Sequence, residues 1–251
     1  MDQNGKEYQK AIEYIRSLII DQKIQIGSRI PPERKISETL SISRNSTREA
    51  LRMLENMGLI ESRQGLGNYL SGNVSQSLSK MIDAMLILQQ TDAEDIFQFR
   101  RGIEKTVFDL AYKKRKNNPY LAQMKPLFPK FPKAMLAAQI EMDKEFHYLL
   151  IRAAGNKLLS IMMSSVSDIY YEGIDLVLRN ASPEVMHNLH LAHLAIYEGL
   201  VQDNPASGIQ AIDRHYDIID KMSFQKYQIG NFYTAHTNES TLYTYKVGCA
   251  D

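Results

Sequence analysis

The segment 43–70 constrains the fold most, because a sharply bounded amphipathic helix stands directly before a hairpin pattern. Ser43 is a suitable helix N-cap, and Gly58 is a suitable stop signal beyond the last turn. After Gly58, short extended runs at 59–63 and 68–70 flank a turn that contains two glycines. The segment therefore predicts one helix followed by a two-stranded hairpin.

Two further helices are predicted before this segment. The first carries an apolar stripe at spacings of four, three and four residues: Tyr8, Ile12, Ile15 and Ile19. The second holds Pro31 and Pro32 in its first turn, where prolines are tolerated, and reaches Leu40. Three helices followed by a hairpin predict a winged helix-turn-helix.

The rest of the chain is predicted to be helical. Helical patterns run through 77–89, 93–114, 120–127, 133–154, 157–179, 183–201 and 205–222. We therefore expect a mainly α protein, in which the winged helix-turn-helix is followed by an all-helical bundle of about six or seven helices. Small polar residues at 71–77 predict a linker. The expected domains are 1–73, 74–223 and a tail of unknown role at 224–251.

Length and composition narrow the class of protein. A chain of 251 residues suits two domains. The longest apolar stretch, 134–140, falls short of the roughly 20 residues that cross a bilayer, so no membrane association is expected. The polar N-terminus is not a secretory signal, and Cys249 has no second cysteine to pair with, which together predict a reducing cytoplasm. A formal net charge of +1 gives no global argument for nucleic-acid binding, so that argument must be local.

Basic residues recur every fourth position on the third predicted helix: Arg44, Arg48 and Arg52. A helix that is apolar on one side and basic on the other suits a DNA major groove, since arginine bonds phosphates or the O6 and N7 of guanine. Asn45 and Ser46 add short polar side chains at the helix start, where recognition helices meet base edges. The alternative is an ordinary solvated helix face, to which Glu49 and Glu55 would also belong.

A second group of residues has the chemistry of a metal site. Asp143 and His147 lie four apart on one predicted helix, so they share a face and could share an ion. Two other predicted helices supply further imidazoles: His187, His190, His193 and His215. Three histidines with one carboxylate suit zinc, nickel or manganese better than calcium. Spacing does not choose among the three clustered histidines, and a structural Asp-His contact is the alternative.

The runs Gly27–Ile36, Ser43–Arg52, Gly58–Ile60 and Gln64–Gly67 resemble the GntR family of bacterial repressors. The resemblance covers about residues 8–70. It implies DNA contact at six matching positions: Arg34, Arg44, Asn45, Ser46 and Arg48, with Gly65 at the tip of the wing. The chain departs from the family pattern at Leu66, which offers no charge at the wing and predicts weaker phosphate contacts there.

Further stretches resemble the FCD-type sensor domain of the FadR branch of that family, over about residues 78–222. They are Phe99–Glu104, Asp143–His147 with Ala154–Asn156, and His193 leading to His215. The resemblance implies a divalent metal, zinc before nickel or manganese, on four residues: Asp143, His147, His193 and His215. It also implies a small carboxylate effector held partly by Arg100. The alternative for Arg100 is an ion pair with Glu104, one turn later on the same helix.

These features together predict a DNA-binding transcription regulator rather than an enzyme. We expect a homodimer that reads a pseudo-palindromic operator through the major groove, because one winged module makes too few contacts for strong specific binding. A small organic or sugar acid at the metal site would release this repressor. The alternatives are a metal sensor without organic effector and a metal-dependent hydrolase in which the ion activates water. No convincing motif supplies a general base for the hydrolase.

Overall fold

The computed structural model describes residues 3–226, and side chains between 7 and 222 apart from those of 168, 170, 172, 173, 176 and 177. Most of the predicted tail at 224–251, with Cys249, lies outside these residues. The chain divides into two compact units, Met1–Met81 and Ile82–Asp251, which are described separately. No helix in the described part of the chain is long and apolar enough to span a bilayer.

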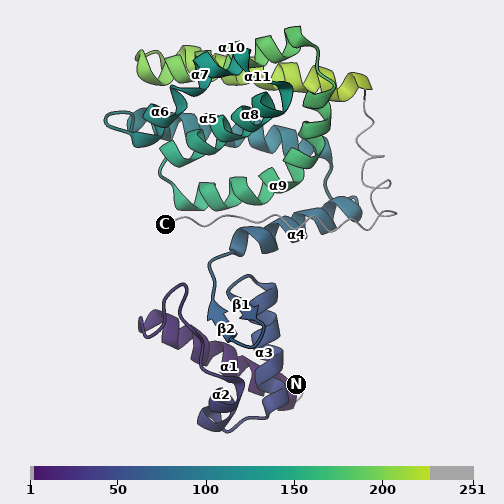
Figure 1. Cartoon of the computed structure of the whole chain (residues 1–251). Helices are drawn as coiled ribbons and strands as arrows, with labels where there is room; N and C mark the ends of the chain where they lie inside the picture. The colour runs from purple at the N-terminus through teal and green to yellow at the C-terminus, as the bar shows by residue number, and fades with distance from the viewer. Residues whose placement is uncertain (1–2, 227–251) are drawn as a thin grey trace. The chain divides into compact units, whose positions relative to one another are not determined.

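The N-terminal unit has the predicted order of three helices and a hairpin (Figure 1). Its elements are α1 (Gln3–Ile20), α2 (Glu33–Leu40), α3 (Arg44–Asn56), β1 (Ile60–Arg63) and β2 (Gly67–Leu70). The strands are antiparallel, with Ile60 opposite Leu70 and Arg63 opposite Gly67. This arrangement confirms the winged helix-turn-helix. One detail differs from the prediction, because Pro32 is the N-cap of α2 with an extended ψ of 148° and precedes the first turn.

Two polar contacts fix the start of α3. The Ser43 side chain accepts a hydrogen bond from the backbone N–H of Ser46 at 3.0 Å, as an N-cap does. The carboxylate of Glu7, on α1, accepts from the backbone N–H of Ser43 at 3.1 Å and from the Ser46 hydroxyl at 2.9 Å. These bonds, led by the one from the Ser43 backbone, lower the pKa of Glu7. Helix α3 is therefore tied to α1 at the end where bases would be read.

A glycine follows the end of α3. Gly58 has a φ of +72°, and a Cβ there would lie 2.5 Å from the backbone oxygen of Asn73. Only glycine fits this position, because the conformation is left-handed and a neighbouring backbone leaves no space. The apolar stripe of α3 then packs into a core with Ala11, Ile15 and Ile36.

The C-terminal unit is a helical bundle. Its helices, with the start of α4 in the first unit, are α4 (Val74–Ile87), α5 (Ala93–Lys113), α6 (Pro119–Met124), α7 (Leu127–Lys130), α8 (Leu136–Ala153), α9 (Lys157–Arg179), α10 (Pro183–Val201) and α11 (Pro205–Lys226). Helix α4 begins inside the predicted linker. The predicted helix 120–127 is split at Pro126, and α8 starts after a 3₁₀ turn, Phe131–Lys133, that contains Pro132. The split follows from Pro126, which has no N–H to continue a helix. Helix α8 begins later than predicted because the backbone is extended at Ala134 and Met135.

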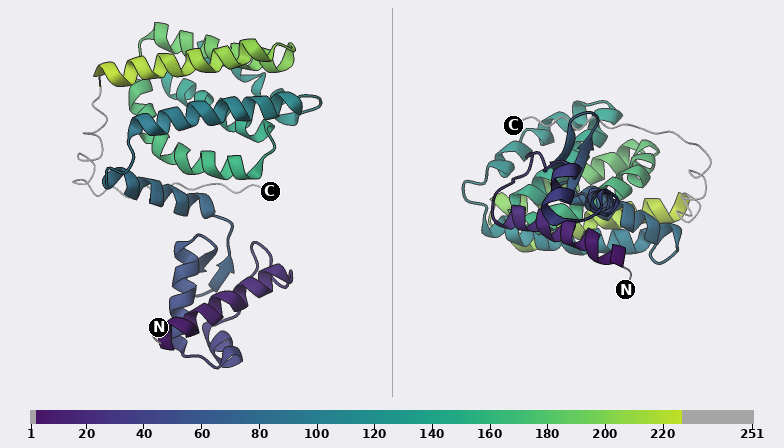
Figure 2. Two further views of the ribbon diagram at one scale, coloured as in Figure 1. Left: turned by 180° about the vertical axis from the view of Figure 1, so that it is seen from behind. Right: turned by 90° about the horizontal axis from the view of Figure 1, so that it is seen from below.

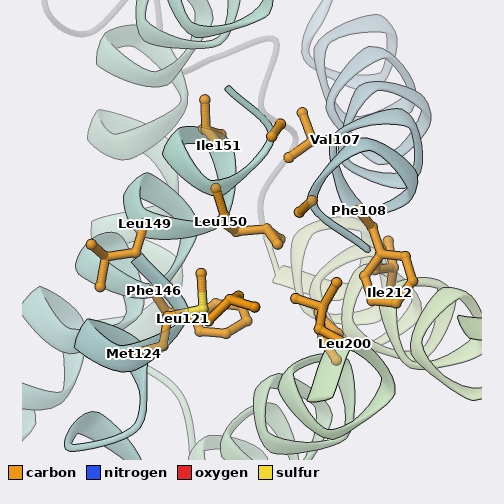
Figure 3. Packing of buried hydrophobic residues seen from close by; sticks show 14 of the residues in the cluster. Val107, Phe108, Leu121, Met124, Phe146, Leu149, Leu150, Ile151, Leu200 and Ile212 are labelled. Carbon is orange, nitrogen blue, oxygen red and sulfur yellow. The ribbon is translucent and has the colours of Figure 1, made fainter. Parts of the chain in front are cut away.

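The bundle is layered around two apolar clusters. Figures 1 and 2 show α5 and α8 between α9 on one side and the pair α10 and α11 on the other. In Figure 3, Phe146 and Leu150 of α8 face Phe108 of α5, Leu200 of α10 and Ile212 of α11. These five side chains are at most 1% exposed. The same four helices carry the polar groups described below, so the core holds those groups in place.

Replacing two glycines of this unit by alanine is expected to change the free energy of unfolding in opposite directions. A Cβ on Gly208 of α11 would overlap the ring of Phe108, whereas one on the exposed Gly102 of α5 would meet nothing within 4 Å. Gly208→Ala is expected to lower the free energy of unfolding by about 1–3 kcal/mol through overpacking. Gly102→Ala is expected to raise it by up to about 1 kcal/mol, since alanine favours helix. Urea unfolding of both variants checks the signs, and equal signs would contradict the close packing of α11 on α5.

Candidate metal centre and nucleic-acid interface

Four predicted metal ligands converge in the bundle. Asp143 and His147 stand one turn apart on α8, His193 comes from α10, and His215 comes from α11. One ligand atom from each residue lies within 4.8 Å of the others. All four residues are at most 5% exposed. Side chains far apart in the sequence thus form one buried group of three imidazoles and one carboxylate.

The contacts within this group leave nitrogen atoms without protein partners. The ring centroids of His193 and His215 are 4.6 Å apart, and each lies within 5.0 Å of the centroid of His147. Nε2 of His193 is 3.5 Å from Oδ1 of Asp143. Neither ring nitrogen of His215 has a hydrogen-bond partner among the described residues. Buried polar atoms without partners are costly, so these donors fit a bound metal ion better than an apolar core.

Burial sets the protonation of three of these residues, whereas for His147 the nearby Glu104 outweighs burial and raises the pKa. Burial lowers the pKa of His193 well below its usual value, and it lowers the pKa of His215 to about 3, helped by the neighbouring His147. Burial also raises the pKa of Asp143. His193 and His215 are therefore neutral at neutral pH, which is the form that binds metal ions.

A second polar layer from α5 lies behind His147. Arg100 and Glu104 are both 0% exposed, and Nη2 of Arg100 is 3.6 Å from Oε1 of Glu104, so the ion pair that the sequence left open is present. The same Oε1 is 2.7 Å from Nδ1 of His147. Arg100 Nη1 also donates to the Ser167 hydroxyl at 2.8 Å. Burial would raise the pKa of Glu104, but His147 and then Arg100 outweigh it and lower that pKa to about 2.

Sequence reasoning missed the contact between Glu104 and His147. The spacing of four residues on one helix was a signal for the pair of Arg100 and Glu104. No comparable spacing connects residues on α5 with a residue on α8. This contact arises because the two helices pack together in the bundle.

The other two clustered histidines line a separate pocket of about 370 Å³. His190 stacks on Phe131 with ring centroids 4.7 Å apart, and His187, Gln139 and Met186 complete much of the wall. Gln139 on α8 and His190 on α10 stand about one turn before the ligand residues of their helices. A helical turn rises 5.4 Å, so the pocket lies next to the metal-ligand group along both helices.

Five of the six predicted DNA-contact residues lie on the exposed surface of the N-terminal unit. They are Arg34 on α2, Arg44, Asn45 and Arg48 on α3, and Gly65 in the turn between the strands. The Arg48 side chain is 52% exposed, and its Nε and Nη2 donate to the Glu33 carboxylate at 3.1 and 2.9 Å. The guanidinium of Arg48 is thus held in one orientation by Glu33 of α2.

Ser46 is placed differently from the other predicted contacts. Its side chain is 0% exposed, and its hydroxyl lies 2.8 Å from that of Ser43 and donates to Glu7. The structure thus gives its hydroxyl an internal contact at the start of α3. The physical reason is the helical repeat, which turns Ser46 to the same side as the buried Ala50.

The wing carries arginines to which sequence reasoning gave no role. The Arg63 guanidinium lies over the Tyr69 ring, 4.4 Å from its centroid. The Arg29 guanidinium lies close to Gly67, at 3.2 Å from where a Cβ would stand. Both arginines are exposed. They offer positive charge beside the exposed Leu66, where the sequence predicted a weak wing.

Comparisons with known proteins agree with this geometry. Residues 7–70 match the family model described as bacterial regulatory proteins, gntR family, and residues 95–218 match that of the FCD domain. The chain is 26% identical to the HTH-type transcriptional regulator LutR of Bacillus subtilis over 206 residues, covering 79% of this chain and 92% of that protein. It is 24% identical to the Glc operon transcriptional activator of Escherichia coli over 230 residues, covering 83% and 85%.

A solved structure of Streptococcus agalactiae GntR has the same fold. It superposes with a TM-score of 0.64 at 21% identity, and the match covers 85% of this chain and 99% of that one. The relatives are transcriptional regulators rather than enzymes, which removes the hydrolase alternative. The chain therefore belongs to the FadR branch of the gntR family of bacterial regulatory proteins, as a transcriptional regulator with a helix-turn-helix domain and an FCD sensor domain.

Proposed function

We propose that this regulator is a homodimeric repressor, which a small carboxylate releases from operator DNA by binding at the metal centre. The observation that carries the proposal is the buried group of Asp143, His147, His193 and His215, in a chain that also presents an exposed basic helix. The C-terminal unit has residues that suit a metal ion and its ligand, and the N-terminal unit has an exposed basic helix that suits DNA.

In the N-terminal unit, α3 would enter the major groove. Arg44 and Arg48 stand one turn apart on its exposed side, and Asn45 lies beside them at the helix start. Arginine forks bond guanine edges or phosphates, and asparagine bonds adenine. Two such units in a dimer would read two half-sites of a pseudo-palindrome.

In the C-terminal unit, a bound divalent ion would outweigh the two carboxylates and so favour an anion. Asp143 and Glu104 are acidic, Arg100 is basic, and the imidazoles bind metal in their neutral form. A divalent ion, of which zinc suits the donors best, would supply a coordination position for a carboxylate oxygen. Arg100 contributes a fixed positive charge behind the ligand residues. The pocket beside Phe131 and His190 would then hold the carbon part of the effector.

Effector binding and operator binding are coupled by thermodynamic linkage. A ligand shifts a protein toward the arrangement that it binds more tightly. The carboxylate therefore lowers operator affinity by the factor by which DNA lowers carboxylate affinity. Release requires that the effector prefers an arrangement of the dimer that DNA does not.

A specific observation favours a second version, a metal sensor without organic effector. Arg100 Nη1 and Nη2 face Ser167 and Glu104 within the protein, so this side chain is already engaged in internal contacts. In that version the ion alone changes operator affinity. Organic acids would have no further effect.

The test is binding of the purified protein to DNA from upstream of its own gene, measured by fluorescence anisotropy with excess unrelated competitor. A salt titration is included because affinity depends steeply on salt. We expect saturable binding that resists the competitor, and release by an organic or sugar acid in the metal-loaded protein. Release by metal alone supports the metal sensor. Failure of every tiled genomic fragment to bind above competitor would refute both versions.

A further inference from the structure

We propose that Glu104 is a positioning residue of the metal centre, whose carboxylate holds His147 as the Nδ1–H tautomer and leaves Nε2 to the ion. The inference rests on the proposed function, because it presumes that the group of three histidines and Asp143 binds a metal. It adds a residue from α5, a helix that supplies none of the four ligands.

The contact itself is short and fully enclosed. Glu104 Oε1 lies 2.7 Å from Nδ1 of His147, with side-chain exposures of 0% and 2%. Water has no access to either atom, so the imidazole has no competing partner at Nδ1. Because the two nitrogens lie on opposite sides of the ring, a hydrogen placed on Nδ1 by this contact would leave Nε2 as the ligand atom.

Arg100 lies beside the Glu104 carboxylate and can balance its charge. A lone carboxyl in a dry core would take up a proton, because burial disfavours the charged form. Arg100 Nη2 is 3.6 Å from Glu104 Oε1, and the Ser167 hydroxyl holds the other end of the guanidinium at 2.8 Å from Nη1. The chain Ser167, Arg100, Glu104 and His147 therefore places a carboxylate oxygen against the ligand residue.

The expected consequence is tighter metal binding. Ligand histidines that donate their second N–H to a carboxylate are fixed in tautomer and orientation and become better electron donors. Loss of such a partner typically weakens metal affinity 10–100-fold. Glu104 would thus act through His147 without touching the ion.

The experiment measures zinc affinity of the full-length protein by competition with a chromophoric chelator. Glu104→Leu is expected to weaken binding 10–100-fold. Glu104→Gln keeps an acceptor oxygen without the charge, and it should fall between Glu104→Leu and the native chain. The control is Glu145→Gln, which removes one negative charge from an exposed position on α8 between two ligand residues and should leave affinity unchanged.

A double variant distinguishes a role of Glu104 in positioning His147 from a role in stabilising the fold. Arg100→Met with Glu104→Leu replaces the buried ion pair by apolar side chains of similar size, which is often neutral for stability. Our proposal requires that this double variant folds and that its zinc affinity is as low as that of Glu104→Leu. Native affinity in the double variant or in Glu104→Leu would overturn the role of Glu104. Absence of zinc binding in the native chain would instead overturn the metal centre, and this inference with it.

Discussion

His215→Ala is expected to abolish stoichiometric zinc binding, the largest single effect that the structure predicts. His215 is the predicted ligand residue from α11, and neither of its ring nitrogens has a protein partner among the described residues. Metal at about 1,000 times its dissociation constant stabilises a native state by about 4 kcal/mol. The native chain should therefore melt at a higher temperature with zinc than without it. The variant should lose that difference, and metal analysis of purified protein should show the same loss.

His187→Ala is the matched control for this experiment. It removes an imidazole from the exposed side of α10, at the rim of the pocket and outside the ligand group. Its metal content and its response to zinc should equal those of the native chain. Full occupancy in His215→Ala, or equal losses in the two variants, would refute the assignment of the ligands.

Arg44→Ala and Arg48→Ala are each expected to weaken operator binding by about 1–3 kcal/mol, or about 5- to 150-fold. Both side chains are exposed on α3. Thermal stability should change by less than about 0.5 kcal/mol for Arg44. It should change by at most about 1 kcal/mol for Arg48, since an exposed ion pair with Glu33 contributes little. Anisotropy titrations with the operator fragment at several salt concentrations supply the measurement.

The salt dependence distinguishes the two kinds of contact. Loss of a phosphate contact lowers the slope of log affinity against log salt by about 1, whereas loss of a base contact relaxes sequence preference at one position. Lys125→Ala removes an equal charge from an exposed position in the other unit and should leave both quantities unchanged. Native affinity in Arg44→Ala and Arg48→Ala would show that α3 is not the recognition helix.

The helices and the hairpin were predictable because their signals are local. Ser43 caps α3 as expected, Gly58 follows the end of α3, and the strands pair across the glycine turn. The predicted helix 120–127 was wrong at Pro126, because apolar periodicity extends through a residue that cannot donate a backbone hydrogen bond. Helix α4 begins before its predicted start for a different reason, because the small polar residues of its first turn are typical of linkers.

The candidate metal centre was only partly determined by the sequence. Asp143 and His147 are paired by helical spacing alone, but spacing does not distinguish His193 from His187 and His190. Only the packing of α8, α10 and α11 brings His193 and His215 to that pair and turns His190 against Phe131.

Local residue order determined the secondary structure, the basic face of α3 and the pair on α8, because these depend on neighbours within a few residues. Tertiary structure alone decided which histidines converge, that Glu104 faces His147, and that the Ser46 hydroxyl donates to Glu7. Such contacts join side chains on different helices. Their distances depend on how apolar cores pack, and no short-range pattern records that packing.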